Sequence, residues 1–171
     1  MTYKLIFLDI DGVLNHELMY TSHKEWEDRL ERLGYPNCMI DEEKVLLLNQ
    51  LIEDTGAKVV VSSTWRLSST VEELQSILEK SGFIGEVIGK TPYLYYGNDG
   101  YTNSVPRGCE IHEWLYKKYG YRYKDDVKFV ILDDDSDMLY WQKDNYISVD
   151  NYCGMTKRTV FKANKILGEI K

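Results

Sequence analysis

Several features that would assign a protein to a special class are missing from this sequence. No apolar run approaches the ~20 residues of a membrane-spanning helix, so we expect no membrane association. The N-terminal stretch has neither a basic region nor a small-residue cleavage site, which predicts no signal peptide and a cytoplasmic location. The cysteines are scattered and form no CxxC pair, which argues against a disulfide framework or a zinc site and favours free thiols: Cys38, Cys109 and Cys153.

An excess of positive charge is also missing. The chain has 21 Lys and Arg against 28 Asp and Glu, a net charge of −7. This acidity argues against a broad surface that coats nucleic acid, but it is compatible with a small pocket that binds phosphate. The length of 171 residues, with 43% hydrophobic and 29% charged residues, predicts one globular domain over residues 1–171.

Short apolar segments alternate with helical patterns along the chain. The segments predicted as buried strands are 3–8, 57–63, 86–89, 128–134 and 145–150. The segments predicted as helices are 41–56, 69–82, 107–120, 136–143 and 156–170. Because the strands are continuous apolar runs joined through helices, we expect an α/β fold with a parallel sheet covered on both faces.

Two segments fall outside this alternation. Residues 15–40 are polar and predict a small, partly helical insertion, and residues 91–105 predict a turn-rich loop. Tyrosines gather in that loop and after the helix that follows it: Tyr93, Tyr95, Tyr96, Tyr101, Tyr116, Tyr119, Tyr121 and Tyr123. Such rings either stack on nucleic-acid bases or pack as ordinary side chains, and the sequence leaves both interpretations open.

The stretch FLDIDGVLN (7–15) ends an apolar strand with two aspartates on one side of the chain, Asp9 and Asp11. Like charges this close repel, and their burial is costly unless something compensates. The carboxyl ends of parallel strands meet at one edge of a sheet, where we expect further polar side chains. These are Ser62, Ser63, Thr64, Asp133 and Asp134, with Arg107 opening the helix before the fourth strand. Mg²⁺ takes oxygen ligands, so we expect it here, with Asp9, Asp11, Asp133 and Asp134 as candidate ligands.

These motifs resemble those of a known superfamily. FLDIDGVLN is similar to the first motif, DxDG(T/V), of the haloacid dehalogenase (HAD) superfamily of phosphotransferases. The hydroxyl after the second strand, the cation before the fourth and the acid pair after it resemble the other three motifs, in order. More narrowly, LDIDGVLN, VVSSTWR, RGCEIHEWL and FVILDDDSDM resemble the HAD-type domains of Swiss Army Knife RNA repair proteins. We therefore expect a single HAD-like hydrolase domain, a Rossmann-like three-layer αβα sandwich with strand order 3-2-1-4-5 and a minimal cap or none.

The resemblance implies a Mg²⁺-dependent phosphomonoesterase that works through an aspartyl-phosphate. Asp9 would be the nucleophile, and Asp11 would protonate the leaving oxygen and then activate water. Ser62 would bind a phosphoryl oxygen, and Arg107 would stabilise the charge of the transition state. Further expected substrate contacts are Gly12, Ser63 and Arg66.

Some assignments stay open at this point. The third motif more often has lysine, so Lys90 is a second candidate for the cation, and either Asp133 or Asp134 is the metal ligand after the fourth strand. Arg66 either binds substrate phosphate or covers Trp65. Asp135 and Asp137 are expected to cap the following helix, and the histidines, which have no ligand spacing, are expected at the surface: His16, His23 and His112.

The substrate is open as well. The resemblance favours a nucleotide or a polynucleotide phosphate end, whereas the negative net charge favours a small phosphate ester. A phosphoaspartate regulatory module also gathers acids at strand ends, and an inactive binding domain is a further alternative. Asp11 distinguishes a phosphatase from a regulatory module, because a general acid and base promotes turnover of the aspartyl-phosphate and does not help to store the phosphoryl group.

Overall fold

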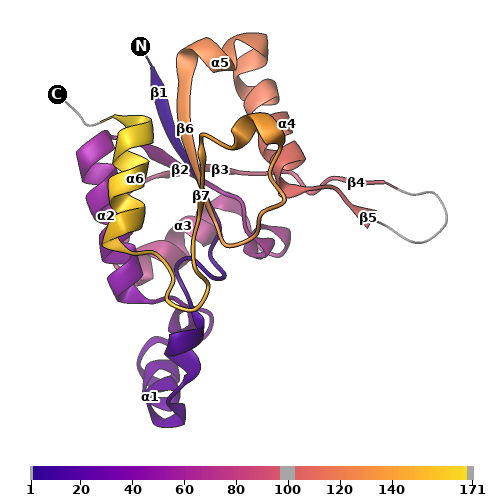
Figure 1. The fold of residues 1–171 in the computed structure, drawn as a ribbon. Helices are drawn as coiled ribbons and strands as arrows, with labels where there is room; N and C mark the ends of the chain where they lie inside the picture. The colour runs from indigo at the N-terminus through magenta and orange to yellow at the C-terminus, as the bar shows by residue number, and fades with distance from the viewer. Residues whose placement is uncertain (1, 97–102, 169–171) are drawn as a thin grey trace.

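The computed structural model describes residues 2–96 and 103–168 (Figure 1). The central sheet consists of β1 (Tyr3–Leu8), β2 (Lys58–Val61), β3 (Val87–Lys90), β6 (Val127–Asp133) and β7 (Tyr146–Ser148). All neighbouring strands are parallel, and their order is β3-β2-β1-β6-β7. This is the predicted order 3-2-1-4-5 once β4 and β5, which form a separate hairpin, are left out of the numbering.

Helices cover both faces of this sheet. On one face, Ile6 and Leu8 pack with apolar residues of α2 (Glu42–Thr55), α3 (Val71–Lys80) and α6 (Lys157–Leu167). On the other face, Leu5 and Phe7 pack with α4 (Arg107–Tyr119) and α5 (Tyr123–Asp126). Successive side chains of β1 thus enter opposite cores, as the period of two in a strand requires. The predicted three-layer αβα sandwich is confirmed.

Local signals in the sequence begin and end the helices. The Asp41 carboxylate accepts a hydrogen bond from the Glu43 N–H and so begins α2, and Gly56, with φ +68°, ends it. Thr70 and Glu73 form a capping box at the start of α3. These contacts explain why the predicted bounds of both helices lie close to the observed ones.

The segment expected as an insertion contains η1 (Glu17–Tyr20), α1 (His23–Leu33) and η2 (Asn37–Met39). In Figure 1, α1 projects away from the sheet, beyond the edge where its strands end. The Asn37 amide joins the insertion to α3 by donating to the Ile77 carbonyl (2.6 Å) and to Ser81 Oγ (3.1 Å). One expectation here is wrong, because His16 is buried and lies 2.8 Å from the Asp41 carboxylate.

Three local predictions need correction. The predicted loop 91–105 contains the hairpin strands β4 (Tyr95–Tyr96) and β5 (Asn103–Ser104), which project sideways in Figure 1, while Tyr101 lies outside the described residues. The predicted helix 136–143 is a single 3-10 turn, η5 (Tyr140–Gln142). Neither η4 (Gly120–Arg122) nor α5 was predicted, because such short elements carry no hydrophobic period. Among the described residues, no helix is both long and apolar enough to cross a membrane.

Candidate active site

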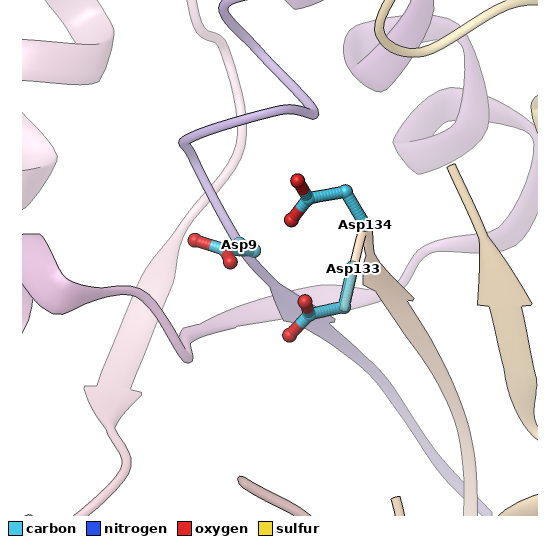
Figure 2. Close-up of side chains that lie close together, drawn as sticks. All are labelled: Asp9, Asp133 and Asp134. Atoms are coloured by element: carbon cyan, nitrogen blue, oxygen red, sulfur yellow. The ribbon is translucent and has the colours of Figure 1, made fainter. Parts of the chain in front are cut away.

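Three carboxyl groups meet at the carboxyl edge of the sheet. Asp9 follows β1, Asp133 ends β6 and Asp134 comes next, and one ligand oxygen from each lies within 4.8 Å of the others. Figure 2 shows Asp133 and Asp134 with their carboxyl groups turned to the side where Asp9 lies. Asp9 and Asp133 are buried, and Asp134 is more exposed than either. The structure therefore brings together three of the four predicted metal ligands.

The environment disfavours negative charge on all three groups. Burial is the largest cause that raises the pKa of each carboxyl group, and Arg107 acts in the opposite direction. For Asp133, burial and the charge of Asp9 raise the pKa to about 8. Asp133 Oδ1 accepts a hydrogen bond from the Asp135 N–H (3.0 Å), whereas Oδ2 is buried without a partner in the described part of the chain.

This donor set fits a divalent cation. A buried carboxylate oxygen without a hydrogen-bond partner is costly, and so is a pair of buried like charges. A hard cation such as Mg²⁺ takes carboxylate oxygens as ligands, usually from one or two residues, and keeps places for water and phosphate. Asp9, Asp133 and Asp134 offer these oxygens from two adjacent strands. Mg²⁺ would satisfy the orphaned oxygen of Asp133 and relieve the repulsion between the acids.

Gly12 makes room for this cluster. Its φ of +74° disfavours other residues, and a Cβ built on it would lie 2.4 Å from Asp134 Oδ2. The glycine of the first motif therefore has a steric reason as well as a conformational one. The structure shows it as a neighbour of the acid cluster; the predicted contact with substrate stays a prediction.

Gly12→Ala is expected to displace the Asp134 carboxylate and raise the Mg²⁺ concentration needed for half-maximal activity roughly tenfold. Gly34→Ala is the matched control, because Gly34 has a similar φ of +68° but the described part of the chain brings no atom within 4 Å of the added Cβ. A titration of activity against Mg²⁺ measures both variants. An equal shift in the two would show that backbone strain, and not the contact with Asp134, is the cause.

Asp11 points to a different set of partners. Its carboxylate accepts hydrogen bonds from Asn15 Nδ2 (2.8 Å), Trp65 Nε1 (3.1 Å) and Thr64 Oγ1 (3.2 Å). The side chain is thus held beside the acid cluster but does not belong to it. Its role as a metal ligand stays a prediction that this geometry does not favour, whereas the donors give it the fixed orientation that a general acid and base needs.

Two serine hydroxyls follow β2 at the same edge. Ser62 and Ser63 are fully buried, and neither Oγ has a hydrogen-bond partner of normal geometry among the described residues, although the Ser63 hydroxyl lies close enough to Asp9 to lower the pKa of that carboxyl group. The Ser62 N–H extends the pairing of β1 and β2 by donating to the Leu8 carbonyl (2.8 Å). Buried hydroxyls without partners are rare, and a phosphoryl oxygen is an acceptor that would satisfy them.

The two candidate phosphate-binding cations, Arg107 and Lys90, lie in different surroundings. The Arg107 guanidinium donates to the Ser62 carbonyl, and its charge lowers the pKa of both Asp9 and Asp133, which places it at the acid cluster. Lys90 Nζ instead donates to two backbone carbonyls of the segment after β2, those of Arg66 (2.8 Å) and Ser69 (2.6 Å). The geometry therefore favours Arg107 as the phosphate-binding cation.

Arg66 is held in a buried ion pair. Its guanidinium donates to Glu110 Oε2 and to the Ser63 carbonyl (2.6 Å), so its charge faces protein groups. Glu110 also accepts from the Leu94 N–H (2.9 Å) and lies 3.9 Å from Arg107 Nε. Burial raises the pKa of Glu110 and lowers that of Arg66, and the charge of each partner opposes this. The prediction that Arg66 contacts substrate is not supported by this arrangement.

Glu110 is a residue of the site that the sequence analysis missed. It ties the base of the hairpin to Arg66 and Arg107, so it fixes the position of the cation. Glu110 could have been predicted from its position, because it stands three residues after Arg107 on the buried face of a predicted helix. A buried acid on an apolar helix face requires a cationic partner.

Asp137 is also placed differently from the expectation. The helix that it was to cap does not form; instead its Oδ2 accepts a hydrogen bond from the Arg107 N–H (2.7 Å) at the start of α4. Asp135 accepts from the Ser136 N–H (2.7 Å) within its own turn. Asp137 therefore helps to hold the first residue of α4, which is the cation of the site.

Comparison with known proteins agrees with this geometry. The family model described as "HAD domain in Swiss Army Knife RNA repair proteins" matches residues 5–160, which include every residue of the site. Searches of curated proteins and of solved structures find no match. The strand order, the acid cluster and the matched segment lead to one conclusion: the chain belongs to the HAD domains of Swiss Army Knife RNA repair proteins, and through them to the HAD superfamily of hydrolases.

Proposed function

We propose that this protein is a Mg²⁺-dependent phosphomonoesterase that forms an aspartyl-phosphate on Asp9. The observation that carries the proposal is the cluster of buried Asp9 and Asp133 with Asp134, which has an unpartnered oxygen among the described residues and a neighbouring arginine. A structural ion-pair network would leave no such oxygen, whereas a site for a cation and a phosphate needs one.

Asp9 is the nucleophile in this proposal. Its Oδ1 accepts a hydrogen bond from the Ile10 N–H (2.7 Å), which fixes the carboxylate and leaves Oδ2 to attack phosphorus. The bond from phosphorus to the leaving oxygen breaks as the bond to Asp9 forms. Asp11 gives a proton to that oxygen, and it then takes a proton from the water that cleaves the aspartyl-phosphate. Inorganic phosphate leaves, and both aspartates return to their first state.

The remaining groups neutralise and orient the phosphate. Arg107 stabilises the negative charge that spreads over the phosphoryl oxygens, and the Ser62 and Ser63 hydroxyls are available as donors. Mg²⁺, when bound by the acid cluster, supplies charge neutralisation that lets an anionic nucleophile approach an anionic phosphate.

Removal of divalent cations is expected to abolish activity. EDTA should lower phosphate release about 100-fold or more, because repulsion between Asp9, Asp133 and the substrate is then uncompensated. Added Mg²⁺ should restore the rate, and release of inorganic phosphate measures both steps. Activity that persists in EDTA would refute the cation in this proposal.

The substrates we propose are nucleotides or phosphorylated nucleic-acid ends. The family description names RNA repair proteins, and the insertion that carries α1 is short, which suits a substrate larger than the site. The net charge of −7 argues only against extended contact with nucleic acid, because a terminal phosphate needs one local cation.

A substrate panel tests this proposal. Phosphate release is measured with Mg²⁺ from an aryl phosphate, from mononucleotides, and from short RNA and DNA carrying 3′- or 5′-phosphates. A clear preference for nucleotides or phosphorylated ends supports the proposal. A preference for the aryl phosphate would identify a phosphatase of small esters.

A further inference from the structure

A hollow of about 250 Å³ lies beside Asp11, between the insertion and the segment after β2. Its lining includes Tyr35 from the insertion, Thr64, Trp65, Ser68 and Ser69 after β2, and Ile77 of α3. Two of these side chains, Trp65 and Thr64, are the ones that donate hydrogen bonds to the Asp11 carboxylate. The hollow and the Asp11 carboxylate therefore share two neighbouring side chains.

This position defines what the hollow can hold. In the proposed reaction Asp11 protonates the leaving oxygen, so the leaving group lies within hydrogen-bond reach of Asp11. The hollow adjoins Asp11 through Trp65 and Thr64, which line it and also donate to the Asp11 carboxylate. A hollow at this place is the one next to Asp11 that the leaving group of the proposed reaction would reach.

The insertion forms the other wall and is anchored in place. Asn37, two residues after Tyr35, donates hydrogen bonds to Ile77 and Ser81 of the α3 segment. Burial raises the pKa of Tyr20 and the charge of Asp11 raises it further, which shows that the insertion also approaches Asp11. Tyr35 itself is 77% exposed, so its ring is free to meet a ligand.

The chemistry of the lining points to one class of leaving group. Among the described residues, the lining offers two aromatic rings and the hydroxyls of Thr64, Ser68 and Ser69, and none of its side chains is charged. Rings of this kind stack on nucleobases, hydroxyls hydrogen-bond to sugar and base edges, and a charged group would find no partner there. A volume of about 250 Å³ lies just below the ~300–1,000 Å³ of sites for drug-sized ligands, which suits a single nucleoside.

We propose that this hollow binds the nucleoside of a nucleotide or of a nucleic-acid terminus, with the base stacked on Tyr35 and Trp65 and the phosphate at Asp9. This inference rests on the proposed phosphatase function and adds the residues that select the leaving group. Tyr35 acts on binding and not on the chemical step, because it contacts the base and not the phosphate.

The test compares substrates that differ only in the base. Rates are measured with Mg²⁺ for adenosine 5′- and 3′-monophosphate and for ribose 5- and 3-phosphate, in the wild type, Tyr35→Ala and Tyr35→Phe. We expect the wild type to prefer one of the nucleotides over its ribose phosphate roughly tenfold or more in kcat/KM. Tyr35→Ala should lose most of this preference through a higher KM, and Tyr35→Phe should keep it because the ring is retained. Tyr121→Ala is the control, since Tyr121 is 86% exposed and does not line the hollow.

The outcomes separate this inference from the proposed function. If nucleotides and ribose phosphates are hydrolysed equally well, or if Tyr35→Ala slows both to the same degree, the stacking site is wrong while the phosphatase stands. If the wild type releases phosphate from none of these esters, nor from the aryl phosphate or the phosphorylated RNA and DNA of the substrate panel, the proposed function itself fails. A loss of preference in Tyr121→Ala equal to that in Tyr35→Ala would also overturn the inference.

Discussion

Asp9→Asn is expected to lower phosphate release at least about 10³-fold, the scale on which loss of a covalent nucleophile acts. The amide is nearly isosteric but does not attack phosphorus, and it removes one of two buried like charges. We therefore expect the variant to be folded and at least as stable as the wild type in the absence of metal. Steady-state rates and thermal unfolding measure the two effects.

The matched control for this variant is Asp125→Asn. Asp125 is an exposed acid in α5, which precedes β6 and so lies at the opposite edge of the sheet from Asp9. The same chemical change there should alter neither the rate nor the stability. Full activity of Asp9→Asn would refute its assignment as the nucleophile, and unfolding of the variant would point to a structural role.

Asp133→Asn is expected to stabilise the metal-free protein and to inactivate it. The pKa of Asp133 is about 8 in the folded protein against 3.8 as the ordinary value. Between about pH 4 and pH 8 the folded state therefore holds a proton that the unfolded chain has lost, and stability falls as the pH rises. At about 1.4 kcal/mol for each pKa unit, this shift sets an upper limit of roughly 5–6 kcal/mol. The amide is still a buried polar group and keeps part of the cost, so we expect the variant to gain roughly 1–3 kcal/mol in free energy of unfolding at pH 8.

Mg²⁺ should reverse this difference. In the wild type it replaces the proton of Asp133, so it should raise the unfolding temperature at pH 8 more than at pH 6. In Asp133→Asn the rise should be small at both pH values, because a ligand of the cluster is missing. Thermal unfolding with and without Mg²⁺ at the two pH values measures this. Equal stabilisation of both proteins would show that the cation binds elsewhere.

The sequence alone was enough to predict the order of strands and helices and the acidic residues of the site. Valine-rich runs such as 57–63, helix caps such as Asp41 and helix stops such as Gly56 are local signals, so the order of strands and helices followed from them. Asp9, Asp133 and Asp134 were found because they stand where a buried strand ends, and parallel strands end at one edge.

Short elements were not predictable in this way. The hairpin strands β4 and β5 have two residues each, and the expected helix 136–143 is a single turn. Segments of this length show no hydrophobic period, and contacts with the rest of the molecule decide their conformation. The buried Gln142, which donates to the Gly108 carbonyl (3.0 Å), is one such contact.

Only the tertiary structure decided which polar groups face the phosphate and which face one another. Arg107 and Lys90 are equal as cations, but Lys90 meets backbone carbonyls and Arg107 meets the acid cluster. Arg66 pairs with Glu110, 44 residues away along the chain. The physical reason is that a buried charge must find a partner, and which partner lies within reach depends on packing between distant segments. The sequence by itself thus determined the acids and their edge of the sheet, and the packing of distant segments determined their partners.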